Sequence, residues 1–381
     1  MSAEQIFTNA NVVLADEVIQ GTVVIKDGVI TAIDAGNSMN PAALNLHGEY
    51  LIPGLVELHT DNLEKHMSPR PAVAWPSIAA MISHDNQIAS AGITTVFDAI
   101  SIGDISPKST RLANLTPMIE ALDYSQKHGL TRSEHKLHFR CEVAHPETWE
   151  IFNANIGNEH VGLVSLMDHT PGQRQFEEMS HYRVYYRQKY GLTADEMSAF
   201  EARQIANAQQ YSEKYRLDIA DFCRRNQIVM ASHDDATENH VLESFNLGMK
   251  IAEFPTTVEA ASHSAQRDLR VLMGAPNIVR GGSHSGNVAA STLAKQDLLH
   301  ILSSDYYPGS LIQAAFILTQ EGIGFDLPKA IRTVSKNPAE AVNLRDRGEI
   351  SIGKKADLLQ VGLHGEQPLI RTVWKSGKRV I

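Results

Sequence analysis

Cysteine is scarce in this sequence, and its scarcity excludes one class of protein. Only Cys141 and Cys223 occur among 381 residues. Two thiols cannot form the disulfide framework that holds small secreted domains together, and so low a count is typical of a reducing compartment. We therefore expect a cytoplasmic protein.

Long apolar runs and an excess of positive charge are missing as well. No run of about 18 or more apolar residues occurs, so the sequence predicts no membrane-spanning helix. The opening residues, MSAEQIFTNANVV, contain no basic segment followed by an apolar one, and so they do not resemble a secretory signal. The formal net charge of -10 argues against nonspecific nucleic-acid binding. An anionic substrate would need a locally basic pocket.

Alternating strand-like and helical segments make up most of the chain. A length of 381 residues with 43% hydrophobic ones suffices for one large domain and a small satellite. From residue 51, short apolar runs with polar ends alternate with helical spacing, which is clearest at 194–226. The eight runs are 51–61, 92–100, 138–146, 161–170, 228–236, 250–257, 271–279 and 299–308. Eight such units indicate a (β/α)8 TIM-type barrel; an open doubly wound sheet is the rival interpretation.

Both ends of the chain have β character. Residues 5–14 and 21–35 predict short strands, and Asp27-Gly28 between two β-branched runs is a strong hairpin signal. Residues 349–381 resemble these strands and could pair with them. We expect a small β-domain formed by residues 1–53 plus 349–381, and a barrel domain formed by residues 54–348.

His59 and Asp61 lie two residues apart at the end of the first apolar run. Side chains alternate across a strand, so both point the same way, which in a barrel is inward at the mouth where active sites form. An imidazole and a carboxylate on one face are half of a plausible site for a borderline divalent metal. Taken alone, such a pair is more often the polar end of a strand.

Glu142 lies inside the strand-like segment FRCEVAH. A carboxylate there is costly to bury unless it is paired or holds a metal. The alternative to a metal ligand is an ion pair with Arg140 or another basic residue. Cys141 would face the helices as a packing residue.

Three further runs end in residues that suit a metal centre. His169 and His233 end the fourth and fifth runs, and Asp168 and Asp234 are adjacent alternatives because periodicity leaves the orientation open by about one residue. Asp305 ends the eighth run, where a carboxylate could take a proton from an attacking water, or cap a helix or turn. Chance placement of so many ligand-type residues at run ends is improbable.

The order His-x-Asp, Glu, His, His, Asp resembles the amidohydrolase superfamily. Its members hold one or two divalent metals with a His-x-His motif on the first strand, a bridging carboxylate or carboxylated lysine, two further histidines and a last-strand aspartate. Asn337-Pro338-Ala339, followed by GEISIGKKADLLQV, is similar to the superfamily's C-terminal signature. The resemblance implies one or two Zn, Mn or Fe ions, Glu142 as the bridge and Asp305 as the general base. The implied metal ligands are His59, Asp61, Glu142, His169 and His233.

Asp61 departs from the superfamily, which usually has a second histidine there. This variant resembles a phosphate-cleaving subgroup, and so do the segments HTPGQRQF, ASHDDAT, EFPTT and GAPNIVRGGSHSGN. The subgroup hydrolyses the phosphoanhydride of α-D-ribose 1-methylphosphonate 5-triphosphate in phosphonate catabolism and releases pyrophosphate. The resemblance implies the same activity for this chain. Glu253 in EFPTT is open as a sixth ligand or a structural acid.

Basic residues near these motifs, and a Gly-rich loop at 280–287, suit a triphosphate. Glycines let backbone amides approach phosphate, and arginine binds its oxygens bidentately. For each basic residue, a solvated surface charge is the alternative. The expected substrate-binding residues are Lys65, His66, Arg70, Arg174, Ser283 and His284.

Two other functions are open. An amidohydrolase acting on a cyclic amide or amino group would keep the metal site and change the bond that is cleaved. A metal-silent assembly protein on this fold would have lost ligands, whereas this set is complete. We expect a small phosphorylated substrate, no nucleic-acid or membrane partner, and a homo-oligomer.

Overall fold

The computed structural model describes residues 4–70, 73–105, 111–174, 179–283 and 286–381. The chain forms two compact units. The first unit comprises Met1–Asp98, Met118–Lys136 and Met273–Ile381, and the second comprises Ala99–Pro117 and Leu137–Leu272. Among the helices in the described ranges, none is both long and apolar enough to cross a lipid bilayer.

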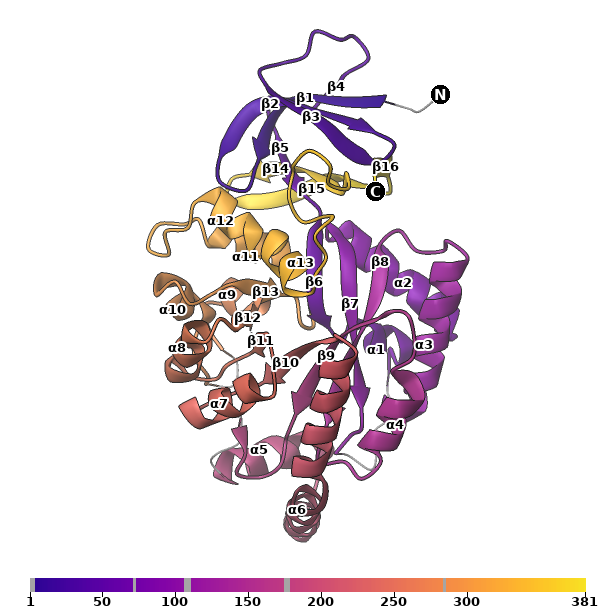
Figure 1. Cartoon of the computed structure of the whole chain (residues 1–381), viewed down its shortest axis with the longest axis vertical. Coiled ribbons are helices and arrows are strands. Elements are labelled where there is room, and N and C mark those ends of the chain that lie inside the picture. Colours follow the sequence, from indigo (N-terminus) through magenta and orange to yellow (C-terminus); the bar gives the residue numbers. More distant parts are fainter. Residues whose placement is uncertain (1–3, 71–72, 106–110, 175–178, 284–285) are drawn as a thin grey trace. The chain divides into compact units, whose positions relative to one another are not determined.

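One sheet joins the two ends of the chain, drawn in indigo and yellow (Figure 1). Its strand order is β16-β15-β14-β5-β1-β2-β3, with β4 paired to β1. The strands are β1 (Glu4–Val13), β2 (Val18–Lys26), β3 (Val29–Ala35), β4 (Leu44–Asn45), β5 (Tyr50–Pro53), β14 (Leu358–His364), β15 (Gln367–Lys375) and β16 (Lys378–Arg379). The predicted β-domain from both termini is therefore confirmed as a sheet. Its exact domain boundaries stay a prediction.

The terminal sheet encloses a core of its own. Phe7 of β1 packs edge-on against Trp374 of β15 with ring centroids 4.8 Å apart, so strands from the two ends of the chain share apolar contacts. The predicted hairpin joins β2 and β3 in antiparallel register. Asp27 and Gly28 both have positive φ, at 54° and 79°, as the tight turn of a two-residue hairpin requires.

The second sheet contains eight strands in the order β13-β12-β11-β10-β9-β8-β7-β6. A parallel bridge between Thr60 and Asp305 links the two ends of this order. The strands are β6 (Leu55–Thr60), β7 (Ile93–Ile102), β8 (Glu134–Glu142), β9 (Val161–Met167), β10 (Val229–His233), β11 (Ile251–Glu253), β12 (Arg270–Gly274) and β13 (Ile301–Ser303). Each lies in one of the eight predicted runs or overlaps it, and the predicted (β/α)8 barrel is confirmed.

Helices follow the barrel strands along the chain. Predicted helix 194–226 is confirmed as α6, which begins after a capping box between Thr193 and Glu196. The helices are α1 (Asn62–Met67), α2 (Ser77–Ser90), α3 (Arg111–Lys127), α4 (Thr148–Asn155), α5 (Met179–Tyr190), α6 (Ala194–Arg225), α7 (Glu238–Asn246), α8 (Val258–Gln266), α9 (Ala275–Val279), α10 (Ala290–Lys295), α11 (Ser310–Ile317), α12 (Leu327–Arg332) and α13 (Lys336–Ala341).

The barrel strands are buried on both faces, as strands covered by crossover helices must be. All ten residues of β7 are buried. A polar side chain in such a strand therefore needs a partner inside the protein. The polar residues at the carboxyl ends of these strands form the candidate site.

Candidate active site

Three strand ends turn through a strained backbone conformation. Asp234 follows β10, Phe254 follows β11 and Asp305 comes shortly after β13, with φ of 57°, 54° and 54°. Residues other than glycine rarely adopt this left-handed region, and the strain is most often retained at functional sites. The three turns lie at the carboxyl ends of barrel strands, which is where active-site residues of such barrels gather.

In the first unit, His59 is almost completely buried near the end of β6. Its backbone N–H donates to Glu57 Oε1 at 2.6 Å, and the Ser304 N–H donates to Glu57 Oε2 at 2.5 Å. Burial raises the pKa of Glu57 to about 8. Glu57 was not predicted as part of the site. Its spacing of two residues from His59, on the same strand face, was the signal that could have found it.

Asp61 and Asp305 are held together through the backbone in this unit. Asp305 N–H donates to His59 O at 3.1 Å, while Asp61 N–H and the Thr60 hydroxyl donate to Asp305 O at 3.3 and 2.9 Å. Asp61 Oδ1 is buried and accepts no hydrogen bond from the part of the chain that the structure describes. Leaving such an atom unsatisfied costs about 1–3 kcal/mol, and more for a charged group. The orphaned oxygen therefore fits a metal ligand.

In the second unit, Glu142 and His169 form a close pair. His169 Nδ1 lies 2.6 Å from Glu142 Oε2, and the His169 N–H donates to Glu142 Oε1 at 3.2 Å. Burial tends to lower the pKa of His169, but the Glu142 carboxylate outweighs it and the pKa is raised. The structure thus brings together two of the predicted ligands, which are 27 residues apart in sequence.

His233 ends β10 beside two carboxylates. Its Nδ1 lies 3.1 Å from Glu253 Oε2, and its Nε2 lies 3.6 Å from Asp234 Oδ2. Burial lowers the pKa of His233 to about 3 and raises that of Asp234 to about 6. One possible ligand atom from each of His169, His233 and Asp234 lies within 4.8 Å of the others. A neutral imidazole has a free lone pair, so this group suits a borderline divalent cation.

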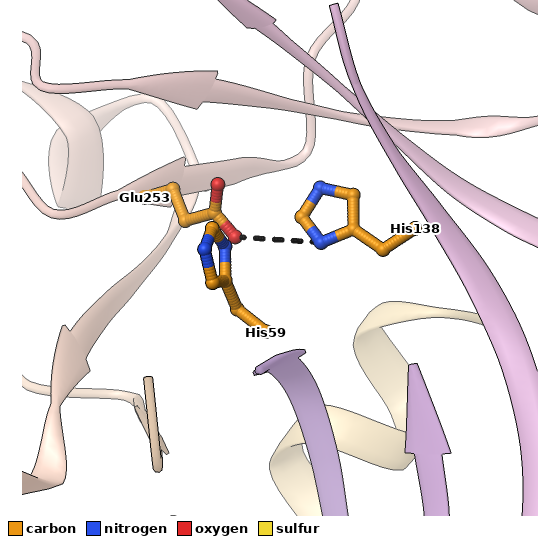
Figure 2. A group of neighbouring side chains, drawn as sticks. All are labelled: His59, His138 and Glu253. Atoms are coloured by element: carbon orange, nitrogen blue, oxygen red, sulfur yellow. Dashed lines mark ion pairs between the residues drawn. The ribbon is translucent and has the colours of Figure 1, made fainter. Parts of the chain in front are cut away.

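Glu253 also approaches a histidine that was not predicted. His138 Nδ1 lies 4.0 Å from Glu253 Oε1, the contact dashed in Figure 2. The other ring nitrogen of His138 lies 2.9 Å from the Ser165 hydroxyl. Both His138 and Glu253 are fully buried in the second unit, whereas His59, also labelled in Figure 2, belongs to the first. His138 lies four residues before Glu142 on β8, and this even spacing was the available signal.

The predicted substrate-binding residues after β6 lie near polar neighbours. Lys65 Nζ donates to Tyr306 O at 2.6 Å and lies 5.3 Å from the centre of its ring. His66 Nε2 lies 3.0 Å from Gln87 Oε1. Arg70 is exposed. The role of Lys65, His66 and Arg70 in substrate binding stays a prediction.

The Gly-rich loop is described only in part. Ser283 is half-buried, whereas His284 lies outside the described residues. The role predicted for this loop in substrate binding stays a prediction.

Arg174, the remaining predicted substrate-binding residue, is buried among carboxylates. Its guanidinium contacts Asp235 and donates to Glu243 Oε2 at 2.9 Å. Arg216 pairs with the other Glu243 oxygen at 2.9 Å and with Asp168 at 3.0 Å. The charge of Arg174 is thus balanced within the protein, and Asp168, an alternative to His169 as a ligand, forms an ion pair.

The first unit contains a second cluster of acid and histidine that was not predicted. Asp98 Oδ1 lies 2.6 Å from His84 Nε2, and Asp98 Oδ2 lies 2.7 Å from His135 Nδ1. His135 Nε2 lies 3.2 Å from Asp85 Oδ1. All four side chains are fully buried. The residues come from α2, β7 and β8, and no single sequence spacing joins them.

Comparison with known proteins agrees with this architecture. Residues 190–381 match the amidohydrolase family. The chain is also 51% identical to α-D-ribose 1-methylphosphonate 5-triphosphate diphosphatase of Escherichia coli strain K12, over 98% of this chain and 100% of that protein. The chain belongs to the amidohydrolase family. The family resemblance found in the sequence is therefore confirmed.

Solved amidohydrolase-type structures share the fold. N-acetylglucosamine-6-phosphate deacetylase from Pasteurella multocida is 13% identical with a TM-score of 0.64, and the match covers 99% of each chain. The 5-methylcytosine deaminase from Klebsiella pneumoniae is also 13% identical, with a TM-score of 0.66 over 99% of this chain and 97% of that one. At such low identity these two matches support the barrel with its terminal sheet, and nothing about the substrate.

Proposed function

We propose that this amidohydrolase hydrolyses the phosphoanhydride of α-D-ribose 1-methylphosphonate 5-triphosphate and releases pyrophosphate in phosphonate catabolism. The observation that carries the proposal is the 51% identity to the Escherichia coli diphosphatase over 98% of the chain. The buried acids and histidines at the strand ends support a hydrolase in which the chemistry is retained. They argue against an assembly protein that has lost its ligands.

The donor set suits one or two divalent ions of Zn, Mn or Fe. The residues that would hold them are His59, Asp61, Glu142, His169 and His233, with Glu142 as the bridge. The orphaned Asp61 Oδ1 and the low pKa of the His233 imidazole support this assignment. Asp234, Glu253 and His138 are further donors beside it. When bound, such an ion supplies Lewis acidity toward phosphoryl oxygen and water.

Asp305 is the group that we assign to move a proton. Water forms a new P–O bond, the bridging P–O bond breaks, pyrophosphate leaves, and the Asp305 carboxylate accepts the proton of the water. The backbone of Asp305 is fixed in the first unit by hydrogen bonds with the backbone of His59 and Asp61 and with the Thr60 hydroxyl. Lys65, His66 and Arg70 would balance the phosphate charge.

The test is an assay of purified protein loaded with Mn²⁺, Zn²⁺ or Fe²⁺. We expect pyrophosphate release from the ribosyl triphosphate, loss of that activity after chelation, and its return when metal is added back. Asp305→Asn should lower the rate about 10²–10⁴-fold because a positioned general base is lost. Cyclic amides and aminopyrimidines are assayed beside it. Turnover of these compounds without pyrophosphate release would favour the alternative function, an amidohydrolase acting on a cyclic amide or amino group.

The expected partners belong to the same proposal. A small phosphorylated substrate follows from the assigned reaction. The expected homo-oligomer is checked by light scattering of the metal-loaded protein. A cytoplasmic location is checked by fractionating the cells in which the protein occurs.

A further inference from the structure

Arg140 lies in the middle of β8, between two residues of the second-unit site. It alternates along the strand with His138 and Glu142, so the three side chains share one face of the sheet. Cys141 has the opposite orientation: it is fully buried, and its thiol is close enough to Cys223 of α6 to affect its pKa. The helices therefore cover the Cys141 face, and Arg140 belongs to the interior face with the metal-ligand candidates.

Among the residues that the structure describes, no carboxylate lies within ion-pair distance of Arg140. The side chain is half-buried, and its Nε is fully buried with no hydrogen-bond partner in those residues. Arg174 and Arg216 of the same unit each pair with two carboxylates. A guanidinium has five N–H donors, and leaving the one at Nε unmatched in a buried position is costly. Arg140 thus lacks the carboxylate partners that Arg174 and Arg216 have in the described part of the chain.

The charge of Arg140 affects the pKa values of His169, His233 and Asp234. Burial lowers the pKa of His233, and the positive charge of Arg140 lowers it further. Burial raises the pKa of Asp234, and Arg140 acts against that rise. Arg140 also opposes the raised pKa of His169. The charge of Arg140 thus acts on all three members of the His169, His233 and Asp234 cluster, and its side chain lies on the same strand face as Glu142, the partner of His169.

We propose that Arg140 binds phosphate oxygens of the substrate at this cluster, as a binding residue of the phosphoanhydride. The inference deepens the proposed function and rests on it. A cation beside cation-binding residues is electrostatically unfavourable until an anion joins them, and the planar guanidinium matches two phosphate oxygens at once. An uncharged cyclic amide would leave Arg140 as uncompensated as before. The unmatched charge therefore selects an anionic substrate.

The test compares Arg140→Met and Arg140→Lys with the matched control Arg216→Met in the metal-loaded protein. The probe is inorganic pyrophosphate, the product, whose binding is measured by calorimetry. Arg140→Met should weaken pyrophosphate at least about tenfold, since hydrogen bonds to charged groups are lost. Arg140→Lys should recover part of the affinity, because the charge returns without the bidentate geometry. Metal content should stay at the wild-type level in all three variants.

Stability separates a ligand-binding arginine from a structural one. Arg140→Met should leave the denaturant midpoint unchanged or raise it, because it removes a buried N–H that has no hydrogen-bond partner. Arg216→Met breaks two ion pairs, so it should lower the midpoint and leave pyrophosphate affinity at the wild-type value. A lowered midpoint for Arg140→Met with unchanged pyrophosphate affinity would overturn the inference.

The binding measurement also keeps the two proposals apart. If the wild type fails to release pyrophosphate from the ribosyl triphosphate yet binds pyrophosphate through Arg140, the proposed function fails and the anion site stands. If the wild type hydrolyses the substrate and Arg140→Met has unchanged kcat, KM and pyrophosphate affinity, the function stands and the role of Arg140 is refuted.

Discussion

Each unit contains a cluster of aspartate and histidine side chains, and the two clusters differ in how far their side chains hydrogen-bond to one another. In the first unit, Asp98 bridges His84 and His135 by hydrogen bonds of 2.6 and 2.7 Å. In the second, His233 Nε2 lies 3.6 Å from Asp234 Oδ2. Both carboxylate oxygens of Asp98 are therefore within hydrogen-bond distance of an imidazole, whereas the Asp234 oxygen lies beyond that distance from His233. The atoms of the first cluster satisfy one another.

The pKa values of the two aspartates, Asp98 and Asp234, are shifted in opposite directions. In the first cluster, burial alone would raise the pKa of Asp98, but the two imidazoles outweigh it and hold the pKa well below its usual range. In the second, burial prevails and raises the pKa of Asp234 to about 6. A carboxylate whose charge is already compensated stabilises the fold, whereas one whose charge is poorly compensated is ready for a ligand. On this difference we predict a structural role for the first cluster and a ligand-binding role for the second.

Replacing a histidine of the second cluster should have the largest effect. His233→Asn removes a predicted ligand, and we expect pyrophosphate release to fall at least about 10³-fold, since bound metal supplies several kcal/mol of transition-state stabilisation. Metal content, measured by elemental analysis, should fall with it, while the denaturant midpoint changes little. Full metal content and activity in this variant would contradict the assignment of the second cluster.

Asp98→Asn should give the opposite pattern. The change leaves the buried His135 imidazolium with only one carboxylate partner, and breaking such a pair typically costs about 3–5 kcal/mol. We expect a lower free energy of unfolding in denaturant titrations, with metal content and kcat of the folded protein unchanged. If the metal is lost while stability is unchanged, the first cluster is also a metal site and the comparison fails.

The pH dependence of stability should follow His135. Burial tends to lower the pKa of His135, but Asp98 and Asp85 outweigh it and raise the pKa to about 9. A raised pKa contributes stability that is fully present below the unfolded value of about 6.5 and is lost as the pH rises through about 9. The free energy of unfolding should therefore fall between about pH 7 and 10, and fall less in His135→Gln. Equal slopes in both proteins would rule out a charged His135.

Arg132 should give the smallest effect. It lies at the rim of the first cluster, where its guanidinium is 3.3 Å from Asp85 but its side chain is 39% exposed. Solvent screens such a pair, so Arg132→Met should cost at most about 1 kcal/mol of unfolding free energy and leave activity unchanged. The Asp85 carboxylate also accepts the backbone N–H groups of Arg132 and Ser133, which the substitution keeps. A loss as large as that of Asp98→Asn would show that the cluster depends on this outer charge.

The sequence alone determined the fold class and the family, and it predicted which strand ends hold the candidate ligands. Alternating runs predicted the barrel because strands covered on both faces need continuous apolar segments. Run ends predicted His59, Glu142, His169 and His233, since parallel strands place their carboxyl ends together. Asp27-Gly28 predicted its hairpin because the required φ values are local.

The tertiary structure decided which side chains satisfy one another. Periodicity gives the face of a strand on which a residue lies, but it does not identify the neighbour across the sheet. The sequence therefore did not predict the contact between Glu253 and His138, or the hydrogen bond that the Ser304 N–H donates to Glu57. For the same reason, no spacing could show that Arg174 is paired, whereas Arg140 Nε has no hydrogen-bond partner in the described part of the chain. Hydrogen bonds and charge compensation act over a few ångströms in space, between residues that the chain brings together only when it folds.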